Sequence, residues 1–187
     1  IADVLVAMNP ATLKANKNWI KKGGTIIVNI DSFTKKDFAK AGYENSPLED
    51  SSFEGFNIIE APITKLTREA LKDSGLDGKS IGRAKNMFAL GIVYWMFNRP
   101  MTQTENFLKK KFEKRPDIVE GNIKVLHAGY NFADTIEALS SSYTVLSANL
   151  EKGTYRNVMG NQAIAWGFLA ASQNANKELF LGSYPIT

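Results

Sequence analysis

The chain of 187 residues contains no cysteine. This absence excludes disulfide bonds, thiolate ligation of iron–sulfur clusters and a cysteine nucleophile within the chain. There is a single histidine, His127, which excludes a site built from several histidines, so we expect no metal site here. His127 has apolar neighbours on its predicted helix face and no carboxylate at an obvious spacing. We therefore interpret it as a packed side chain rather than a general base.

Long hydrophobic runs and strong net charge are also missing. The longest apolar run, Met87 to Phe97, is far shorter than the about 20 residues that cross a membrane, so we expect a buried core helix and no membrane contact. The net charge of +4 gives little reason to expect nucleic acid as a partner. No signal peptide opens the chain, and both of its ends look cut from something larger. We expect a piece of a larger cytoplasmic protein.

The first thirty residues contain a strand–helix–strand pattern. Ile1 to Asn9 is apolar, Pro10 to Lys22 has a helical pattern, and Thr25 to Ile30 is a β-branched run. Gly23 and Gly24 are typical signals that a helix ends. The strands of such a unit are parallel, and strands that are apolar throughout are covered by helices on both faces. We therefore predict an α/β fold, with a three-layer, Rossmann-like domain and a mainly parallel sheet.

Further elements are predicted along the rest of the chain. They are a short helix capped by Thr34, a strand at Phe56 to Ile63, a helix capped by Thr64 or Thr67 that ends near Asp73, and helices at Ser80 to Asn98, Thr104 to Lys114 and Asp117 to Phe132. A serine-rich stretch then has the composition of a linker. After it we predict a buried-type helix at Gly160 to Ala175 and a strand that begins at Glu178. This helix and strand need a partner sheet, so we interpret them as a piece of a second domain.

Four residues are candidate cofactor ligands. Asn9 and Asn29 end the first two strands, at the sheet edge where open α/β folds bind ligands, although asparagine there also caps helices or turns the chain. Arg83 and Asn86 lie in the first turns of the Ser80 helix, where a phosphate could offset the unfavourable cations. The alternative is a solvated helix face. The basic run from Lys109 to Arg115 similarly indicates either an acidic partner or a solvated helix end.

Sequence motifs that would identify a reaction are absent. The chain has no phosphate-loop motif, no GxGxxG, no GxSxG and no cluster of metal ligands. The residues alone therefore predict a parallel α/β domain whose chemistry is absent or lies outside this chain.

Four segments resemble one family in the same order along the chain. They are ADVLVAMNPATLKANKNWIKKGGTIIVN, GRAKNMFALG, EGNIKVLHAGYNF, and YRNVMGNQAIAWGFLAA followed by LFLGSYPIT. The first three resemble the gamma domain of the 2-oxoacid (pyruvate or 2-oxoglutarate):ferredoxin oxidoreductases, and the last resembles the start of their alpha subunit. The resemblance implies a gamma domain at 1–137, a linker at 138–155 and the start of the thiamine diphosphate-binding alpha domain at 156–187. A gamma domain ahead of an alpha domain is similar to the 2-oxoglutarate type.

The resemblance also implies an activity, cofactors and partners. Enzymes of this family decarboxylate a 2-oxoacid on thiamine diphosphate, pass electrons through iron–sulfur clusters to ferredoxin and release an acyl-coenzyme A. The implied partners are therefore a beta subunit, ferredoxin, coenzyme A and the 2-oxoacid, in an oligomer, with magnesium among the cofactors of the complete enzyme. The threonine of Tyr-Pro-Ile-Thr, here Thr187, would lie at the substrate and thiamine site, where its hydroxyl could bond a carboxylate or carbonyl.

The chain also departs from the family pattern. The glycine-rich opening of a gamma domain, the glutamate that activates thiamine and the cluster-bearing part are all absent, so we expect the isolated chain to be inactive. Two alternatives remain open from the residues: a fragment of a nicotinamide-dependent dehydrogenase, and a non-catalytic interaction domain.

Overall fold

A three-stranded parallel sheet lies at the centre of the N-terminal part of the chain. The computed structural model describes residues 1–49, 51–138, 143–182 and 184. The strands, in their spatial order, are β1 (Ala2–Ala7), β2 (Ile20–Asn29) and β3 (Asn57–Ala61). Ile27 in the central strand stands opposite Val6 on one side and Ile59 on the other, and both pairings are parallel. The predicted α/β class with parallel strands is confirmed.

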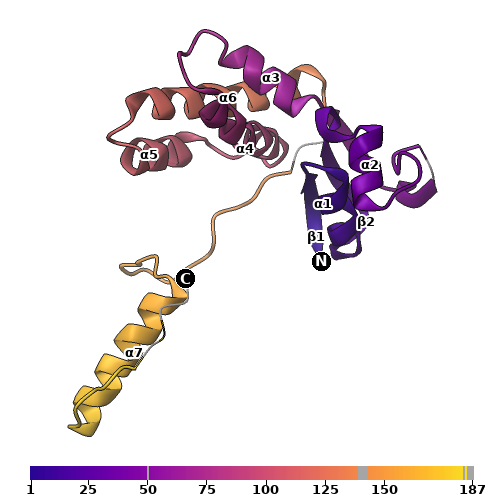
Figure 1. The fold of residues 1–187 in the computed structure, drawn as a ribbon. Helices are drawn as coiled ribbons and strands as arrows, with labels where there is room; N and C mark the ends of the chain where they lie inside the picture. The colour runs from indigo at the N-terminus through magenta and orange to yellow at the C-terminus, as the bar shows by residue number, and fades with distance from the viewer. Residues whose placement is uncertain (50, 139–142, 183, 185–187) are drawn as a thin grey trace. The chain divides into compact units, whose positions relative to one another are not determined.

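The described residues form seven α-helices. They are α1 (Pro10–Asn16), α2 (Lys35–Ala41), α3 (Ile63–Ala70), α4 (Gly78–Met96), α5 (Thr102–Lys111), α6 (Pro116–Thr135) and α7 (Gly160–Ala175), with short 3-10 turns at Lys17–Trp19, Ile30–Ser32 and Ser51–Phe53. Figure 1 shows α1 and α2 together beside the strands and α3 to α6 gathered as a separate helical layer.

Alternate residues of β2 supply the cores on the two faces of the sheet. Ile26 and Val28 pack with Leu13 of α1 in one buried cluster. Ile27 faces the other way and packs in a second cluster with Phe88 and Ile92 of α4, to which α3 and α6 also contribute. Because successive side chains of a strand point to opposite faces, one apolar run serves both layers. The predicted three-layer arrangement is confirmed.

The predicted end of the first helix is wrong. The helix stops at Asn16, and Gly23 and Gly24 lie inside β2 rather than in a turn after a helix. Ala2 pairs with Ile20 whereas Val4 pairs with Thr25, so β2 bulges at the two glycines. Gly23 has φ of +74°, and a Cβ on Gly24 would meet the Asp3 carbonyl oxygen at 3.0 Å. A bulge needs glycine for the same conformational freedom as a helix end does, so the two structures have the same sequence signal.

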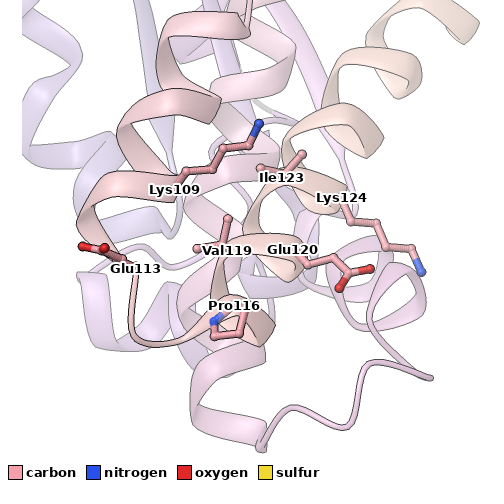
Figure 2. A pocket seen from close by; sticks show the side chains of 7 residues that line it. All are labelled: Lys109, Glu113, Pro116, Val119, Glu120, Ile123 and Lys124. Carbon is pink, nitrogen blue, oxygen red and sulfur yellow. The ribbon is translucent and has the colours of Figure 1, made fainter.

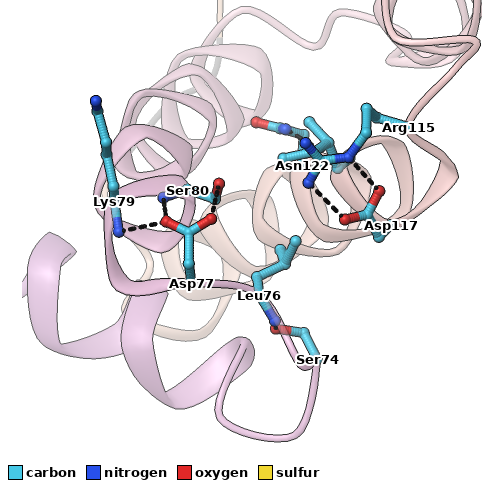
Figure 3. A network of polar contacts seen from close by, with 9 residues as sticks. Ser74, Leu76, Asp77, Lys79, Ser80, Arg115, Asp117 and Asn122 are labelled. Carbon is cyan, nitrogen blue, oxygen red and sulfur yellow. Dashed lines mark hydrogen bonds and ion pairs between the residues drawn. The ribbon is translucent and has the colours of Figure 1, made fainter.

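The cap of α4 also differs from the prediction. Asp77, not Ser80, caps this helix: its Oδ1 accepts the backbone N–H groups of Lys79 and Ser80, each at 2.9 Å (Figure 3). The Ser80 hydroxyl donates to the other Asp77 oxygen. The donors at Ser80 hold the pKa of the Asp77 carboxyl below its usual value of 3.8. Thr34 does cap α2, as predicted.

The Asp77 cap predicts a pH dependence of stability. A carboxyl whose pKa is lowered by folding stabilises the fold above its unfolded pKa, and this contribution is lost as the pH falls through its folded pKa. We expect Asp77→Ala to lower the Tm at pH 7, and the difference from the parent to shrink below about pH 4. Asp77→Asn, which still presents an oxygen to the helix, should keep most of the Tm at pH 7. Thermal unfolding followed by circular dichroism from pH 7 to about pH 2 measures this; a pH-independent difference would contradict it.

The chain separates into two compact units, Ile1–Leu146 and Ser147–Thr187. In the second unit α7 forms at the predicted residues, but it is not buried here: its large apolar side chains are exposed, Ile164, Trp166 and Phe168 among them. The strand predicted from Glu178 does not form in the described residues 178–182. A strand needs a neighbour to pair with, and the described part of this unit contains none.

Candidate functional site

Asn9 is an exposed helix cap at the end of β1. Its side-chain Oδ1 accepts the backbone N–H of Thr12 at 2.9 Å and the Thr12 hydroxyl at 3.1 Å. Its backbone is extended, with φ of −162°, as a residue before a helix requires. This geometry matches the capping alternative, and the predicted cofactor contact of Asn9 stays a prediction.

Asn29 is fully buried and joins the end of β2 to the start of α3. Its Nδ2 donates to the hydroxyls of Thr64 at 2.9 Å and Ser32 at 3.1 Å, and its Oδ1 accepts the Thr64 N–H at 3.2 Å. Asp31 accepts the next N–H, that of Lys65, at 2.7 Å. The N-terminus of α3 is thus capped by two residues more than thirty positions earlier in the chain. The predicted local caps, Thr64 or Thr67, are wrong, because Pro62 precedes the helix and both threonines lie inside it.

We predict a large loss of stability when Asn29 is truncated. Asn29→Ala removes three hydrogen bonds and leaves the N–H of the half-buried Thr64 without its acceptor, which should cost roughly 2 kcal/mol. Asn9→Ala, which removes an exposed cap, should cost about 1 kcal/mol and serves as the matched control. Urea unfolding of both variants measures the free energies. A smaller loss for Asn29→Ala than for Asn9→Ala would contradict the bridging role.

Arg83 and Asn86 lie one helical turn apart on α4 and line the same cavity, of about 260 Å³, between α4, α5 and α6. The other lining residues are Ser80, Met87, Phe107, Leu108, Lys111, Phe112, Ile118 and Asn122. Asn86 also borders a second hollow, of about 330 Å³, formed with Val6 of β1 and Met8, which follows that strand. Of the four predicted ligands, the structure brings only these two together.

His127 has a carboxylate partner that the sequence spacing did not reveal. Its Nε2 lies 2.7 Å from Oε1 of Glu105, so the pair joins α6 to α5. The interpretation of His127 as a packed side chain is wrong, because the ring is exposed and pairs with Glu105 on a different helix. The His127 side chain is 46% exposed, and the pair sits on the surface as a link between two helices.

The basic run before α6 is partly neutralised. Arg115 holds Asp117 through two hydrogen bonds, from Nε at 3.1 Å and from the terminal nitrogen at 2.8 Å (Figure 3). This pairing lowers the pKa of Asp117 and raises that of Arg115. Asp117 also lies in the first turn of α6, where a negative charge is favourable. These contacts stabilise the start of the helix.

An open groove of about 550 Å³ runs along α5 and α6, with Val119 and Ile123 at its base (Figure 2). Lys109 and Lys124 stand at its sides together with an equal number of acidic side chains, those of Glu113 and Glu120. The balanced charges give this groove no preference for anions or cations.

Some predictions concern groups outside these hollows. Thr187 lies outside the described residues. Within the described ranges no three acidic or histidine side chains gather as metal ligands would. The same residues include no helix long and apolar enough to cross a membrane.

The Pyruvate ferredoxin/flavodoxin oxidoreductase family model matches residues 1–132, which include the sheet and most of α6. The chain belongs to this family. It is 44% identical to the 2-oxoglutarate oxidoreductase subunit KorA of Mycobacterium tuberculosis over 185 residues, 99% of this chain. It spans 28% of the length of that relative.

A solved structure shares the fold. The 2-oxoglutarate:ferredoxin oxidoreductase from Magnetococcus marinus, with 2-oxoglutarate, coenzyme A and succinyl-CoA bound, matches 78% of this chain and 22% of its own with a TM-score of 0.56. The sequences are 23% identical. The resemblance to the 2-oxoacid:ferredoxin oxidoreductases is confirmed, and it favours this family over a nicotinamide-dependent dehydrogenase or a non-catalytic domain.

Proposed function

We propose that this chain is part of a subunit of an enzyme that oxidatively decarboxylates a 2-oxoacid, with 2-oxoglutarate as the substrate. The products are carbon dioxide and an acyl-coenzyme A, and the two electrons pass to ferredoxin. The observation that carries this proposal is the 44% identity to a 2-oxoglutarate oxidoreductase subunit over 99% of the chain. We further propose that the enzyme is cytoplasmic and oligomeric and contains a beta subunit.

The iron–sulfur clusters of this reaction do not fit the residues of this chain. Iron–sulfur clusters need thiolate ligands, and the sequence has no cysteine. The clusters would therefore be held by other parts of the complete enzyme, and we propose that thiamine diphosphate and magnesium are held mainly there as well. We assign this chain a scaffolding and binding role, inactive when isolated.

We assign the first unit to a gamma domain and the second to the start of an alpha domain. The family match ends at residue 132, and the two compact units divide at Leu146, within the proposed linker at 138–155. The exposed apolar side chains of α7 support a partner surface for this helix elsewhere in the complete alpha domain.

The four proposed cofactor ligands differ in whether their side chains already form hydrogen bonds within this chain. Asn9 and Asn29 already use their amides to cap helices, whereas Arg83 and Asn86 form no ion pair or side-chain hydrogen bond within the described residues. The proposal of cofactor contact is therefore best supported for Arg83 and Asn86. Thr187 is proposed as the residue that touches the substrate.

Reconstitution tests this function. The full-length polypeptide would be co-expressed with its beta subunit and assayed without oxygen for ferredoxin reduction. We expect reduction that requires both 2-oxoglutarate and coenzyme A and is slower with pyruvate. Ferredoxin reduction that proceeds with neither substrate preference nor coenzyme A dependence would contradict the proposal.

A further inference from the structure

The cavity between α4, α5 and α6 differs in charge from the other hollows on this unit. Arg83 and Lys111 line it, and no acidic residue does. Neither cation has a carboxylate within ion-pair distance among the described residues. The groove along α5 and α6 has balanced charges, and the hollow at Asp73 and Asp117 is rich in acids. A cavity whose walls carry two unpaired cations favours an anion.

The same cavity has an aromatic wall. The Nζ of Lys111 lies 5.3 Å from the ring centre of Phe107 and 5.5 Å from that of Phe112. Phe107 is 58% exposed, although the next residue, Leu108, is buried. A planar group placed against these rings would cover apolar surface and remain close to the Lys111 ammonium.

Polar side chains beside the cations are available to a ligand. Asn86 makes no side-chain hydrogen bond within the described residues, so its amide offers both a donor and an acceptor. Asn122 donates to the Ile118 carbonyl at 2.7 Å through its Nδ2, which leaves its Oδ1 as an acceptor. Ser80, in contrast, is committed to the Asp77 cap.

We propose that this cavity binds a small aromatic anion. Its planar ring lies against Phe107 and Phe112, and its phosphate or carboxylate is held by Arg83 and Lys111. A volume of about 260 Å³ holds one ring system and one anionic group, and is below the usual range for whole drug-sized ligands. The inference rests on the proposed cofactor contact of Arg83 and Asn86, and it adds the ligand class and the α5 residues.

Two ligand sources share this chemistry and can be separated. Adenosine monophosphate represents a nucleotide, and benzoate an aryl carboxylate; inorganic phosphate and adenosine each lack one half of the ligand. Binding to the 187-residue chain would be measured by titration calorimetry and by saturation-transfer NMR. We expect saturable binding of adenosine monophosphate, benzoate or both, and the one that binds more tightly identifies the source. Phosphate or adenosine should bind at least about tenfold more weakly.

Matched variants locate the binding. Arg83→Gln and Lys111→Gln should each weaken binding at least about tenfold, since each removes one charge-assisted contact. Lys109→Gln, on the same helix as Lys111 but lining the balanced groove, should leave the affinity unchanged. Unchanged circular dichroism spectra would establish that the exposed substitutions preserve the fold.

Three results would overturn the inference: no saturation by either aromatic anion below about 10 mM, equal binding of inorganic phosphate, or equal weakening by Lys109→Gln and Arg83→Gln. Binding is measured without turnover, so a failure here leaves the ferredoxin-reduction test of the enzyme unaffected.

Discussion

Gly129→Ala is expected to lower the free energy of unfolding by about 3 kcal/mol or more, because α4 and α6 cross with their backbones in contact. A Cβ on Gly129 would lie 2.0 Å from the carbonyl oxygen of Phe88 and 2.7 Å from its carbonyl carbon. These are backbone atoms in the middle of α4, so a rotamer change cannot relieve the clash. The helices would have to separate, and the buried Phe88 and Ile92 would lose packing against α6.

Two other glycines make this prediction specific. Gly91 faces the same crossing from α4, where a Cβ would meet the Leu126 carbonyl oxygen at 2.1 Å, so Gly91→Ala should be comparably destabilising. Gly82, earlier on α4, is exposed, and a Cβ added there would meet no atom within 4 Å. Gly82→Ala should stabilise by up to about 1 kcal/mol, because alanine is the better helix former. Urea unfolding compares the three; a Gly129→Ala chain as stable as Gly82→Ala would contradict the crossing.

Thr187→Val in the complete enzyme is expected to reduce turnover on the order of 10²-fold. Valine keeps the size of threonine and removes the hydroxyl proposed to bond the carboxylate or carbonyl of the 2-oxoacid. A hydrogen bond that strengthens as charge develops on the substrate lowers the barrier more than it aids binding, so kcat should fall more than KM rises.

The control for Thr187→Val is Thr102→Val, which removes the hydroxyl of an exposed threonine in the first turn of α5. It should leave both kcat and KM unchanged. Steady-state kinetics with 2-oxoglutarate and excess coenzyme A separates the two constants. Equal turnover by Thr187→Val and the parent would remove Thr187 from the active site.

The sheet was predictable from the sequence because its strands are short, apolar and β-branched. The run at Thr25 to Asn29 is buried between the two helical layers and that at Val4 to Ala7 is half-buried to buried, and few other structures suit such a composition. The glycine signals at Gly23 and Gly24 were ambiguous, since a helix end and a strand bulge both require the freedom that glycine provides.

The side-chain bridges between distant segments were not predictable from local patterns. The cap of α3 depends on Asn29 and Asp31, and the partner of His127 is Glu105, on another helix. Helical spacing reveals neighbours three or four residues apart, but it contains no information on which helices pack together.

The sequence predicted the α4 residues of the candidate cavity but not its α5 residues. Arg83 and Asn86 stand at a spacing that places both on one face of α4, and the sequence singled them out for their position near the helix start. Lys111 was one of several cations in the basic run, and no pattern in the sequence singled out Phe107 or Phe112. Their role depends on how α5 packs on α6, which follows from the tertiary structure alone.

The central claim is that this chain belongs to an enzyme that converts 2-oxoglutarate to an acyl-coenzyme A. The most direct measurement is mass spectrometry of the coenzyme A products after incubation with carbon-labelled 2-oxoglutarate, thiamine diphosphate, magnesium, coenzyme A and oxidised ferredoxin. We predict labelled succinyl-coenzyme A from the full-length polypeptide with its beta subunit and none from the 187-residue chain alone. No acyl-coenzyme A from the complete enzyme, or its formation by the isolated chain, would contradict the account.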